Sequence, residues 1–493
     1  MKNRILSGIG WTTASSIMRN VVALLQIAIL TRFLNKEDFG IVAIANLFVT
    51  FTTLFLDMGV SVGIIHKQNI TKNEYSSLFW LNVFFGVGLT TILYFLAPIL
   101  TFQYHSEDLT RVVRLICFTI LFSALGTQHR TYCQKMTYFK RMSIIETFSF
   151  FVTFVIALVT AIKGCGVYSL AYSTLAGSFF LNLSYFVIGI IKDSTITFHF
   201  SLNETFSFLK IGIYQVGSTI LDFFTRELDI MIVSATLGLE FLGVYNIAKR
   251  MPTALYTFIQ PIVARVCTPL LAEKSENRYS LKKSYMEMTK ALSWVSFPMY
   301  FLVAALSPTI MIFMFGIEYV VGVPVMMVFC LRYAFNGING ICGALQVATG
   351  RTDIGLWWTI YSIISTTIVY YVSAQWGIAS LLTGMSLLVF INVVVVWFMQ
   401  FKPLVDISWK EYIAIYLNSF CISVALSLAI YVLYNDYSII YAIVSSLFYL
   451  LLYFILILNS KDGYVIISQI DMLNIPDSVK TRLTKVRFKN DKL

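Results

Sequence analysis

The chain has 493 residues, of which 58% are hydrophobic and only 12% charged, and its formal net charge is +11. Soluble globular domains carry about 25% charged residues, so this composition excludes a soluble globule and indicates a polytopic membrane protein. The positive charge does not indicate a nucleic-acid partner, because most of the 36 lysines and arginines lie in connections between apolar segments. The seven cysteines form no CxxC pair and mostly lie within apolar segments, as small core residues do.

Apolar windows long enough to cross about 30 Å of hydrocarbon predict fourteen transmembrane helices. We expect the first seven near residues 9–31, 39–64, 78–99, 110–128, 143–163, 167–191 and 211–235. The second seven are expected near residues 243–270, 289–314, 323–348, 354–374, 377–399, 411–433 and 437–458. The predicted fold class is therefore an all-α integral membrane protein.

An internal match divides the fourteen segments. Residues 29–48 align without a gap with residues 232–251, which places Gly40 on Gly243 and Glu37 on Glu240. Five apolar segments lie between the copies, so the repeat would be six helices long and both halves would have the same orientation, related by a pseudo-twofold axis along the membrane normal. The alternative is a chance agreement between two short motifs.

With this repeat, the expected organisation is an N-terminal six-helix lobe (1–191), a cytoplasmic linker (192–210), a C-terminal six-helix lobe (211–401), two additional helices (402–458) and a basic tail (459–493). The two lobes are expected to be parallel. Alternate connections differ sharply in lysine and arginine content, and the basic set includes both termini, so both termini are expected in the cytoplasm. Residues 273–290 and 471–493 are predicted to be surface helices or flexible segments that lie against anionic lipid.

No catalytic motif stands out in the sequence. There is no HExxH or Walker sequence and no GxSxG worth the name, the four histidines are dispersed near connections, and no external connection exceeds roughly a dozen residues. We therefore expect no catalytic residues, no metal site and no cofactor.

Ionisable residues inside predicted helices are energetically expensive and point to function by default. The segment 211–235 contains Asp222, Arg226, Glu227 and Asp229. Asp222, Arg226 and Asp229 are spaced by four and three residues, so they share one helix face and can pair with one another. Two interpretations remain open: a self-neutralising structural cluster, or a direct role in ion coupling or gating.

A second set of buried charges is basic. Arg19, Arg250 and Arg332 have no acid three or four residues away in their own segments, and Lys249 precedes Arg250. These residues either meet a partner on another helix or line an aqueous cavity that attracts an anionic substrate. The excess of positive charge favours the cavity, and a guanidinium matches phosphate in a bidentate fashion.

Several segments resemble a known family. They are DMGVSVGIIHKQNITKNEYSSLFWLN at 57–82, LGVYNIAKR at 242–250, QPIVARVCTPLLA at 260–272 and the segment 315–353, which ends in ALQVATGRTD. In order and spacing these segments resemble bacterial polysaccharide exporters of the colanic-acid type. The resemblance implies membership of the superfamily that also holds multidrug extruders and lipid II flippases, with two six-helix lobes facing across a central cavity.

The resemblance also implies a function. Such exporters flip undecaprenyl-diphosphate-linked oligosaccharides from the cytoplasmic to the outer leaflet of the bacterial inner membrane, by alternating access and without a cofactor. The expected partners are the lipid-linked substrate, membrane lipids, and a polymerase and glycosyltransferases of the same pathway. Arg19 and Arg250 are similar in position to functional arginines of lipid II flippases, whereas a further arginine of those proteins falls near Gln26 here.

The size of such a substrate requires a lateral opening, which we expect beside residues 9–31 and 243–270. Two other functions remain as alternatives. A cation-coupled multidrug extruder of the same fold would need an acidic cavity, whereas the predicted site is basic. An intramembrane glycosyltransferase or polymerase would be recognised by sugar transfer.

Overall fold

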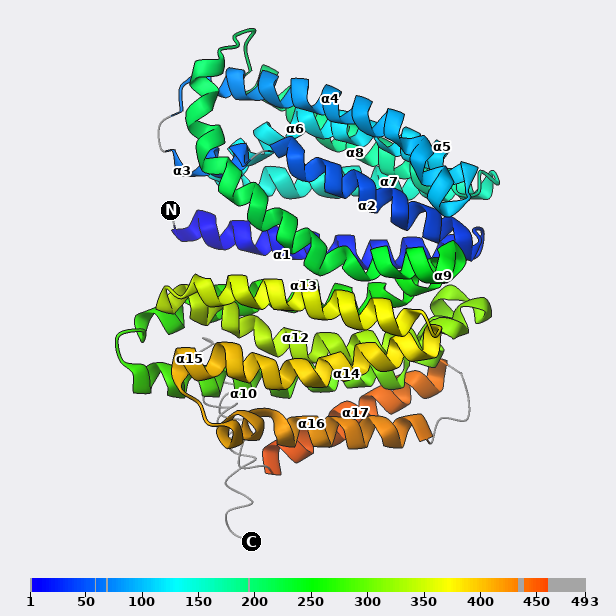
Figure 1. Ribbon diagram of the computed structural model, residues 1–493, viewed down its shortest axis with the longest axis vertical. Coiled ribbons are helices and arrows are strands. Elements are labelled where there is room, and N and C mark those ends of the chain that lie inside the picture. The colour runs from blue at the N-terminus through cyan, green and yellow to red at the C-terminus, as the bar shows by residue number, and fades with distance from the viewer. Residues whose placement is uncertain (1, 58, 68–69, 194–195, 433–438, 460–493) are drawn as a thin grey trace. The chain divides into compact units, whose positions relative to one another are not determined.

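In the computed structural model the described part of the chain is made of helices and short connections (Figure 1). The structure describes residues 2–57, 59–67, 70–193, 196–432 and 439–459, and no strand occurs among them. The predicted basic tail lies almost entirely outside the described residues.

The first half of the chain forms α1 (Lys2–Leu30), α2 (Lys36–Asp57), α3 (Val60–His66), α4 (Lys72–Tyr104), α5 (Glu107–Ile116), α6 (Phe118–Lys135), α7 (Phe139–Ile162), α8 (Tyr168–Ile191) and α9 (Leu202–Glu273). The second half forms α10 (Arg278–Ala305), α11 (Ser307–Ile310), η1 (Met311–Phe315), η2 (Ile317–Gly322), α12 (Val323–Thr349), α13 (Thr352–Ala374), α14 (Ile378–Val396), η3 (Trp397–Phe401), α15 (Lys402–Val405), α16 (Trp409–Val432) and α17 (Ile439–Asn459).

Among the described residues, 11 helices are long and apolar enough to cross a membrane. The number rises to 12 if Arg278–Ala305 and Ser307–Phe315, which meet at a bend of 61°, form one span. The protein is therefore an all-helical, multi-pass membrane protein. Length and hydropathy alone do not reproduce the predicted count of fourteen.

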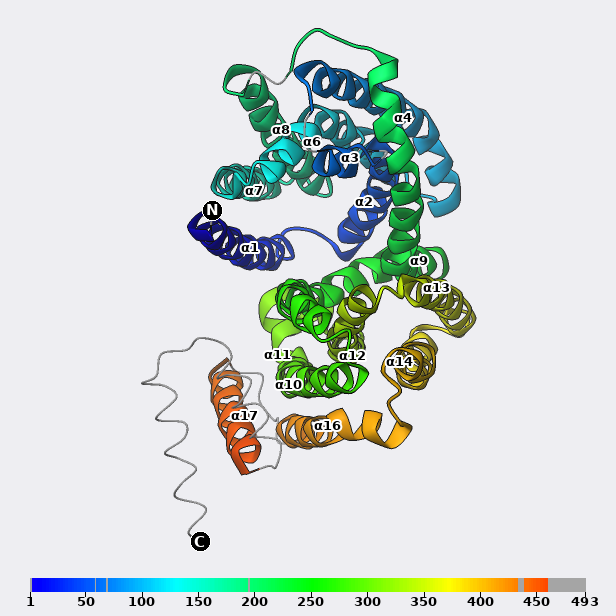
Figure 2. The ribbon, with the colours of Figure 1, turned by 90° about the vertical axis from the view of Figure 1, so that its left-hand side faces the viewer.

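The chain divides into two compact units. Unit 1 comprises Met1–Arg250 and Thr359–Leu381. Within it α7 packs against both α1 and α8, α6 packs against α4 and α8, and α2 packs against α5 (Figure 2). Small and polar side chains allow this close packing: Asn182 on α8 approaches Gly126 on α6, where a Cβ would overlap it.

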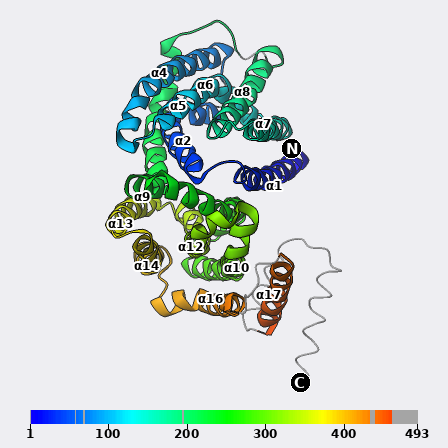
Figure 3. The ribbon, with the colours of Figure 1, turned by 90° about the vertical axis from the view of Figure 1, so that its right-hand side faces the viewer.

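Unit 2 comprises Met251–Trp358 and Leu382–Leu493. Its centre is α10, which packs against α12 and α16 (Figure 3). Helix α17 is held by two buried tyrosines, since Tyr453 donates a hydrogen bond to the carbonyl of Trp294 at 3.2 Å and Tyr449 donates one to the carbonyl of Ser423 at 3.5 Å. The two additional helices, α16 and α17, thus pack against α10 within unit 2.

Helix α9 contains the two segments predicted at 211–235 and 243–270. They are helical on both sides of Gly238, whose φ of 81° and ψ of 174° lie outside the helical region. Glycine adopts such a backbone without the Cβ penalty that other residues pay. The predicted division between the two segments therefore exists, as a sharp break rather than as a loop.

The two copies of the internal repeat touch each other in unit 1. A Cβ at Gly40 would overlap the carbonyl oxygen of Leu239, and a Cβ at Gly243 would overlap the carbonyl oxygen of Lys36. In the repeat alignment Gly243 is the counterpart of Gly40 and Leu239 is the counterpart of Lys36, so the contact is reciprocal. A pseudo-twofold axis between the copies would produce such a reciprocal contact, and an ion pair of 3.6 Å between Lys36 and Glu240 adds to it.

Two predicted boundaries need correction. The span expected to begin near residue 289 begins earlier, because α9 continues to Glu273 and α10 begins at Arg278, so most of the polar segment 273–290 is helical. Asn277 caps α10 by accepting a hydrogen bond from the amide of Ser280 at 3.1 Å, which explains why the helix begins there despite its polar residues. The segment expected at 110–128 is two helices, α5 and α6, that meet at Cys117.

Candidate substrate site

Three charged side chains of unit 1 form a cluster that we call the arginine triad: Arg19, Arg130 and Glu146. Arg19 Nη1 lies 3.1 Å from Glu146 Oε2, and Arg130 Nη2 lies 2.7 Å from Glu146 Oε1. The packing of α7 against α1 and α6 brings the three together. Arg19 therefore meets a partner on another helix, which is one of the two interpretations that the sequence left open; the other was an aqueous cavity. Two arginines share one carboxylate, so the arginine triad keeps one uncompensated positive charge.

Sequence reasoning missed two members of this triad. Neither was among the predicted site residues, because Glu146 lies near the start of the segment expected at 143–163 and Arg130 lies just beyond the segment expected at 110–128. In the structure only 17% of the Glu146 side chain and 24% of the Arg19 side chain are exposed, whereas Arg130 is 54% exposed. The sequence signal that could have found this cluster was Glu146, a single acid among several basic residues in neighbouring predicted helices.

A groove of about 480 Å³ lies between α1 and α7, next to Arg19. We call it the α1–α7 groove. Its lining is mostly apolar: Trp11, Ala14, Met18, Val22, Ile144, Phe148, Phe150 and Phe151, with Ser15, Arg19, Ser143 and Thr147 among them. Its volume falls in the range of about 300–1,000 Å³ that is typical of small-ligand sites.

A second charged cluster lies within α9. The carboxylate of Asp229 is buried and accepts Lys249 Nζ at 2.9 and 3.0 Å, the hydroxyl of Tyr245 at 3.0 Å and the amide of Ile230 at 2.9 Å. Residues 229 and 249 meet because the arms of α9 fold back on each other at Gly238. Asp229 therefore takes a cation from the other arm of α9, a partner that helical spacing within one segment did not suggest.

The remaining predicted residues of α9 lie around this pair. Glu227 interacts electrostatically with Lys249, Arg226 and Arg250. The side chains of Asp222, Arg226 and Arg250 are exposed. Exposure of Arg250 in a segment that would otherwise be apolar agrees with either a polar cavity or an interface.

The last predicted residue is Arg332. It belongs to α12 in unit 2, where its side chain is half-buried and engaged with other residues. The structure therefore brings Arg19 to Glu146 and Lys249 to Asp229, but Arg332 belongs to a different unit.

One cluster in unit 1 has side chains that could ligate a metal. Atoms of His129, Cys133 and Asp193 lie within 4.8 Å of one another, and these ligand types suit zinc. However, Arg141 Nη1 lies 2.7 Å from the Asp193 oxygen Oδ2, which is also the oxygen 3.1 Å from His129 Nε2. Because a guanidinium already neutralises that carboxylate, the geometry favours an Arg–Asp–His network. The spacing of His129 and Cys133 by four residues was the sequence signal for this cluster.

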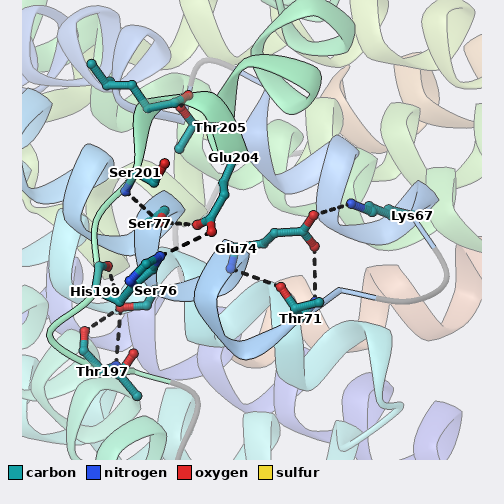
Figure 4. Close-up of polar contacts among 11 residues, drawn as sticks. Lys67, Thr71, Glu74, Ser76, Ser77, Thr197, His199, Ser201, Glu204 and Thr205 are labelled. Atoms are coloured by element: carbon teal, nitrogen blue, oxygen red, sulfur yellow. Dashed lines mark hydrogen bonds and ion pairs between the residues drawn. The ribbon is translucent and has the colours of Figure 1, made fainter.

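Hydrogen bonds hold the predicted linker against the first turns of α4 (Figure 4). The hydroxyl of Ser76 donates to the carbonyl of His199 at 2.9 Å, and the hydroxyl of Ser77 donates to Glu204 at 2.6 Å. Ser77 also accepts the amide of Ser201 at 3.0 Å, and His199 lies 3.1 Å from Glu204. The hydrogen bond from Ser77 lowers the pKa of the Glu204 carboxyl. We call this network the linker clasp.

Comparison with known proteins identifies the family. The model of a family described as polysaccharide biosynthesis protein matches residues 29–324, which is more than half of the chain. The chain belongs to the polysaccharide biosynthesis protein family. The match includes α9, the Gly40–Gly243 contact and Glu146, and it begins after Arg19.

Curated relatives agree with this membership. The chain is 26% identical to the teichuronic acid biosynthesis protein TuaB of Bacillus subtilis, over 77% of this chain and 78% of that protein. It is 22% identical to the lipopolysaccharide biosynthesis protein WzxC of Escherichia coli, over 84% of each chain. The family expected from the sequence is thus confirmed.

Its fold is similar to that of the lipid II flippase MurJ in an inward closed conformation, with a TM-score of 0.73, 15% identity and coverage of 91% of this chain and 97% of that one. An inward-facing multidrug transporter of the MATE family also matches, with a TM-score of 0.61, 12% identity and coverage of 83% and 95%. These likenesses establish that the chain has the fold shared by these two transporter groups.

Proposed function

We propose that this family member is a flippase that moves undecaprenyl-diphosphate-linked oligosaccharides from the cytoplasmic to the outer leaflet for exopolysaccharide, capsule or O-antigen assembly. The observation that carries the proposal is the arginine triad, which keeps an uncompensated positive charge within membrane helices beside an apolar groove. A lipid with a phosphate head group satisfies both features, because guanidinium binds phosphate and the walls bind hydrocarbon. Membership of a polysaccharide biosynthesis family supports a glycan as the cargo.

We propose that the chain crosses the inner membrane fourteen times, with both termini in the cytoplasm. The 11 spans become 12 when the bent pair is one span. Counting Val216–Gln260 as two, since it breaks at Gly238, and adding Thr352–Ala374 gives the remaining two. An even number agrees with the excess of lysine and arginine at both termini and in alternate connections.

Transport in this proposal requires no covalent chemistry. A six-helix lobe at residues 1–191 and another at 211–401 would expose the binding site alternately to the two sides of the membrane. Arg19, Arg250, Lys249 and Arg332 are proposed to bind the diphosphate or stabilise the cavity. The cluster of Asp222, Arg226, Glu227 and Asp229 is proposed to act in coupling or gating, with Asp229 setting the geometry of Lys249.

The function can be tested in two settings. In cells, depletion of the protein should cause lipid-linked oligosaccharide to accumulate in the inner leaflet while glycosyltransferase activities stay normal. In vesicles, the purified protein should increase the rate at which a fluorescent polyprenyl-diphosphate sugar crosses the bilayer. The rate is measured as the change over time in the fraction of the sugar that a lectin added outside can bind. Unchanged rates in vesicles together with normal export in depleted cells would refute the proposal.

The alternatives make different predictions in the same assays. An extruder of lipophilic cations would lower the accumulation of a cationic dye, and it would need an acidic site where the arginine triad is basic. A glycosyltransferase or polymerase would lengthen the glycan on the lipid, which mass spectrometry of the recovered lipid would detect.

A further inference from the structure

We infer that the α1–α7 groove receives the head-proximal part of the polyprenyl chain of the substrate, while Arg19 and Arg130 bind its diphosphate in place of Glu146. This inference rests on the proposed function and adds a binding surface and two residues, Arg130 and Glu146, to it. The lateral opening was expected beside residues 9–31 and 243–270. The groove lies along the first of these segments, which is α1, and its other wall is α7.

The walls of the groove are suited to hydrocarbon. Trp11 and Met18 of α1 and Phe148 and Phe151 of α7 are large, apolar and exposed, although they surround one concave surface. A soluble anion at Arg19 would leave these side chains without a ligand. An apolar ligand without charge would leave the positive charge of the arginine triad uncompensated. The combination fits an amphipathic lipid with an anionic head group.

The arginine triad is arranged so that an anion can replace Glu146. Each oxygen of the carboxylate binds a different arginine, Oε2 binding Arg19 and Oε1 binding Arg130. A diphosphate offers one phosphate group to each guanidinium and carries more negative charge than a carboxylate. Arg130 is more than half exposed, so the phosphate can reach it before Glu146 is released. Glu146 thus acts as a built-in counter-ion that stabilises the empty site.

The length of the groove sets how much of the lipid it holds. Along α1 it extends from Trp11 to Val22, which at about 1.5 Å per residue is roughly 16 Å. This is about half of a hydrocarbon core of about 30 Å, so the distal part of a long prenyl chain remains among the lipids. A ligand held in this manner keeps its tail in the bilayer while its head group moves.

The inference can be tested by photocross-linking. A polyprenyl diphosphate that carries one sugar and a photoreactive group near the head would be incorporated with the purified protein into vesicles of phosphatidylethanolamine and phosphatidylglycerol. We expect adducts on the tryptic peptide of residues 142–163, and we expect excess unlabelled polyprenyl diphosphate, but not added phosphatidylglycerol, to reduce them. Equal competition by phosphatidylglycerol would overturn the inference, because the groove would then hold bulk lipid.

Variants provide a second measurement. Thr147→Trp fills the groove and Arg130→Gln removes one phosphate ligand, so each should lower labelling of this peptide by about tenfold or more. The matched controls are Val159→Trp, an exposed position on α7 outside the groove lining, and Arg111→Gln, which breaks an exposed pair with Glu107. The controls should label as wild type does.

Glu146→Gln should change the labelling of this peptide in the opposite direction. Removing the counter-ion should increase labelling, because the phosphate no longer competes with a carboxylate, whereas a purely structural Glu146 would give unchanged or lower labelling. If the wild-type protein flips the probe but its adducts lie outside residues 142–163, this inference fails and the proposed function stands. If the probe neither labels the protein nor is flipped, the proposed function itself fails.

Discussion

Asp229 and Lys249 are separated by 20 residues of α9, yet Lys249 Nζ lies 2.9 Å from a buried carboxylate oxygen of Asp229 because the helix folds back at Gly238. Tyr245 donates a further hydrogen bond to the same carboxylate at 3.0 Å. The pair therefore fixes the angle between two helical segments in addition to cancelling two charges. Its role in structure and its role in transport can be separated by mutation.

We expect Asp229→Asn and Lys249→Gln each to destabilise the purified protein by about 3–5 kcal/mol, since each leaves one buried charge unpaired. The double variant should recover much of the lost thermal stability, because neither charge remains. If the double variant is stable and still flips substrate, the pair is structural; if it is stable and inactive, the pair takes part in coupling. Thermal unfolding in detergent and the vesicle assay provide the two measurements.

The arginine triad predicts unequal effects for its members. Arg19→Ala leaves Glu146 paired with Arg130, so we expect normal amounts of folded protein but a loss of export. Glu146→Ala leaves two arginines without a carboxylate, so its melting temperature should fall further, by an amount that corresponds to about 1–3 kcal/mol. Equal stability of the two variants would contradict the shared carboxylate.

Arg250 allows a separate test of charge. Its side chain is exposed, so Arg250→Ala should express at the wild-type level. If Arg250 binds phosphate through its planar fork, Arg250→Lys should restore export only in part. Normal export by a well-expressed Arg250→Ala would remove it from the proposed site.

The reciprocal glycine contact predicts a sensitive pair of positions. Gly40→Ala and Gly243→Ala should each destabilise the protein by about 1–3 kcal/mol, because the new methyl group meets a backbone carbonyl that cannot rotate away. Gly88→Ala is the control, since nothing lies within 4 Å of a Cβ there, and it should be neutral or slightly stabilising. Melting temperatures of the three variants compare the effects directly.

The linker clasp should respond to pH. Since the pKa of Glu204 is lower in the folded protein, its carboxylate stabilises the clasp above the unfolded pKa of about 4.3, and this contribution is lost as the pH falls through the folded value. Hydrogen exchange of residues 196–206, corrected for its intrinsic pH dependence, should therefore increase at low pH. Ser77→Ala should produce the increase already at neutral pH, and Ser184→Ala, whose hydroxyl bonds only within its own helix at 2.7 Å, should not.

The sequence alone determined the membrane class, the positions of most apolar segments and the family. These properties are local, because a segment long and apolar enough to cross hydrocarbon is recognisable without its neighbours. The repeat was also visible, since Gly40 and Gly243 lie in copies of one motif. Arg19, Asp229 and Lys249 stood out as costly charges within apolar segments. What the sequence could not supply was the partner of each charge.

Only the tertiary structure decided those partners, because charges pair through space and the helical spacing rule considers neighbours within one helix. That rule offered Arg226 as a possible partner of Asp229, whereas the break at Gly238 brings Lys249 Nζ to 2.9 Å from the Asp229 carboxylate. It left Arg19 without an acid, because Glu146 lies on another helix that packing brings within 3.1 Å. The α1–α7 groove likewise exists only when two helices lie side by side, since a concave surface is a property of their packing and of neither sequence alone.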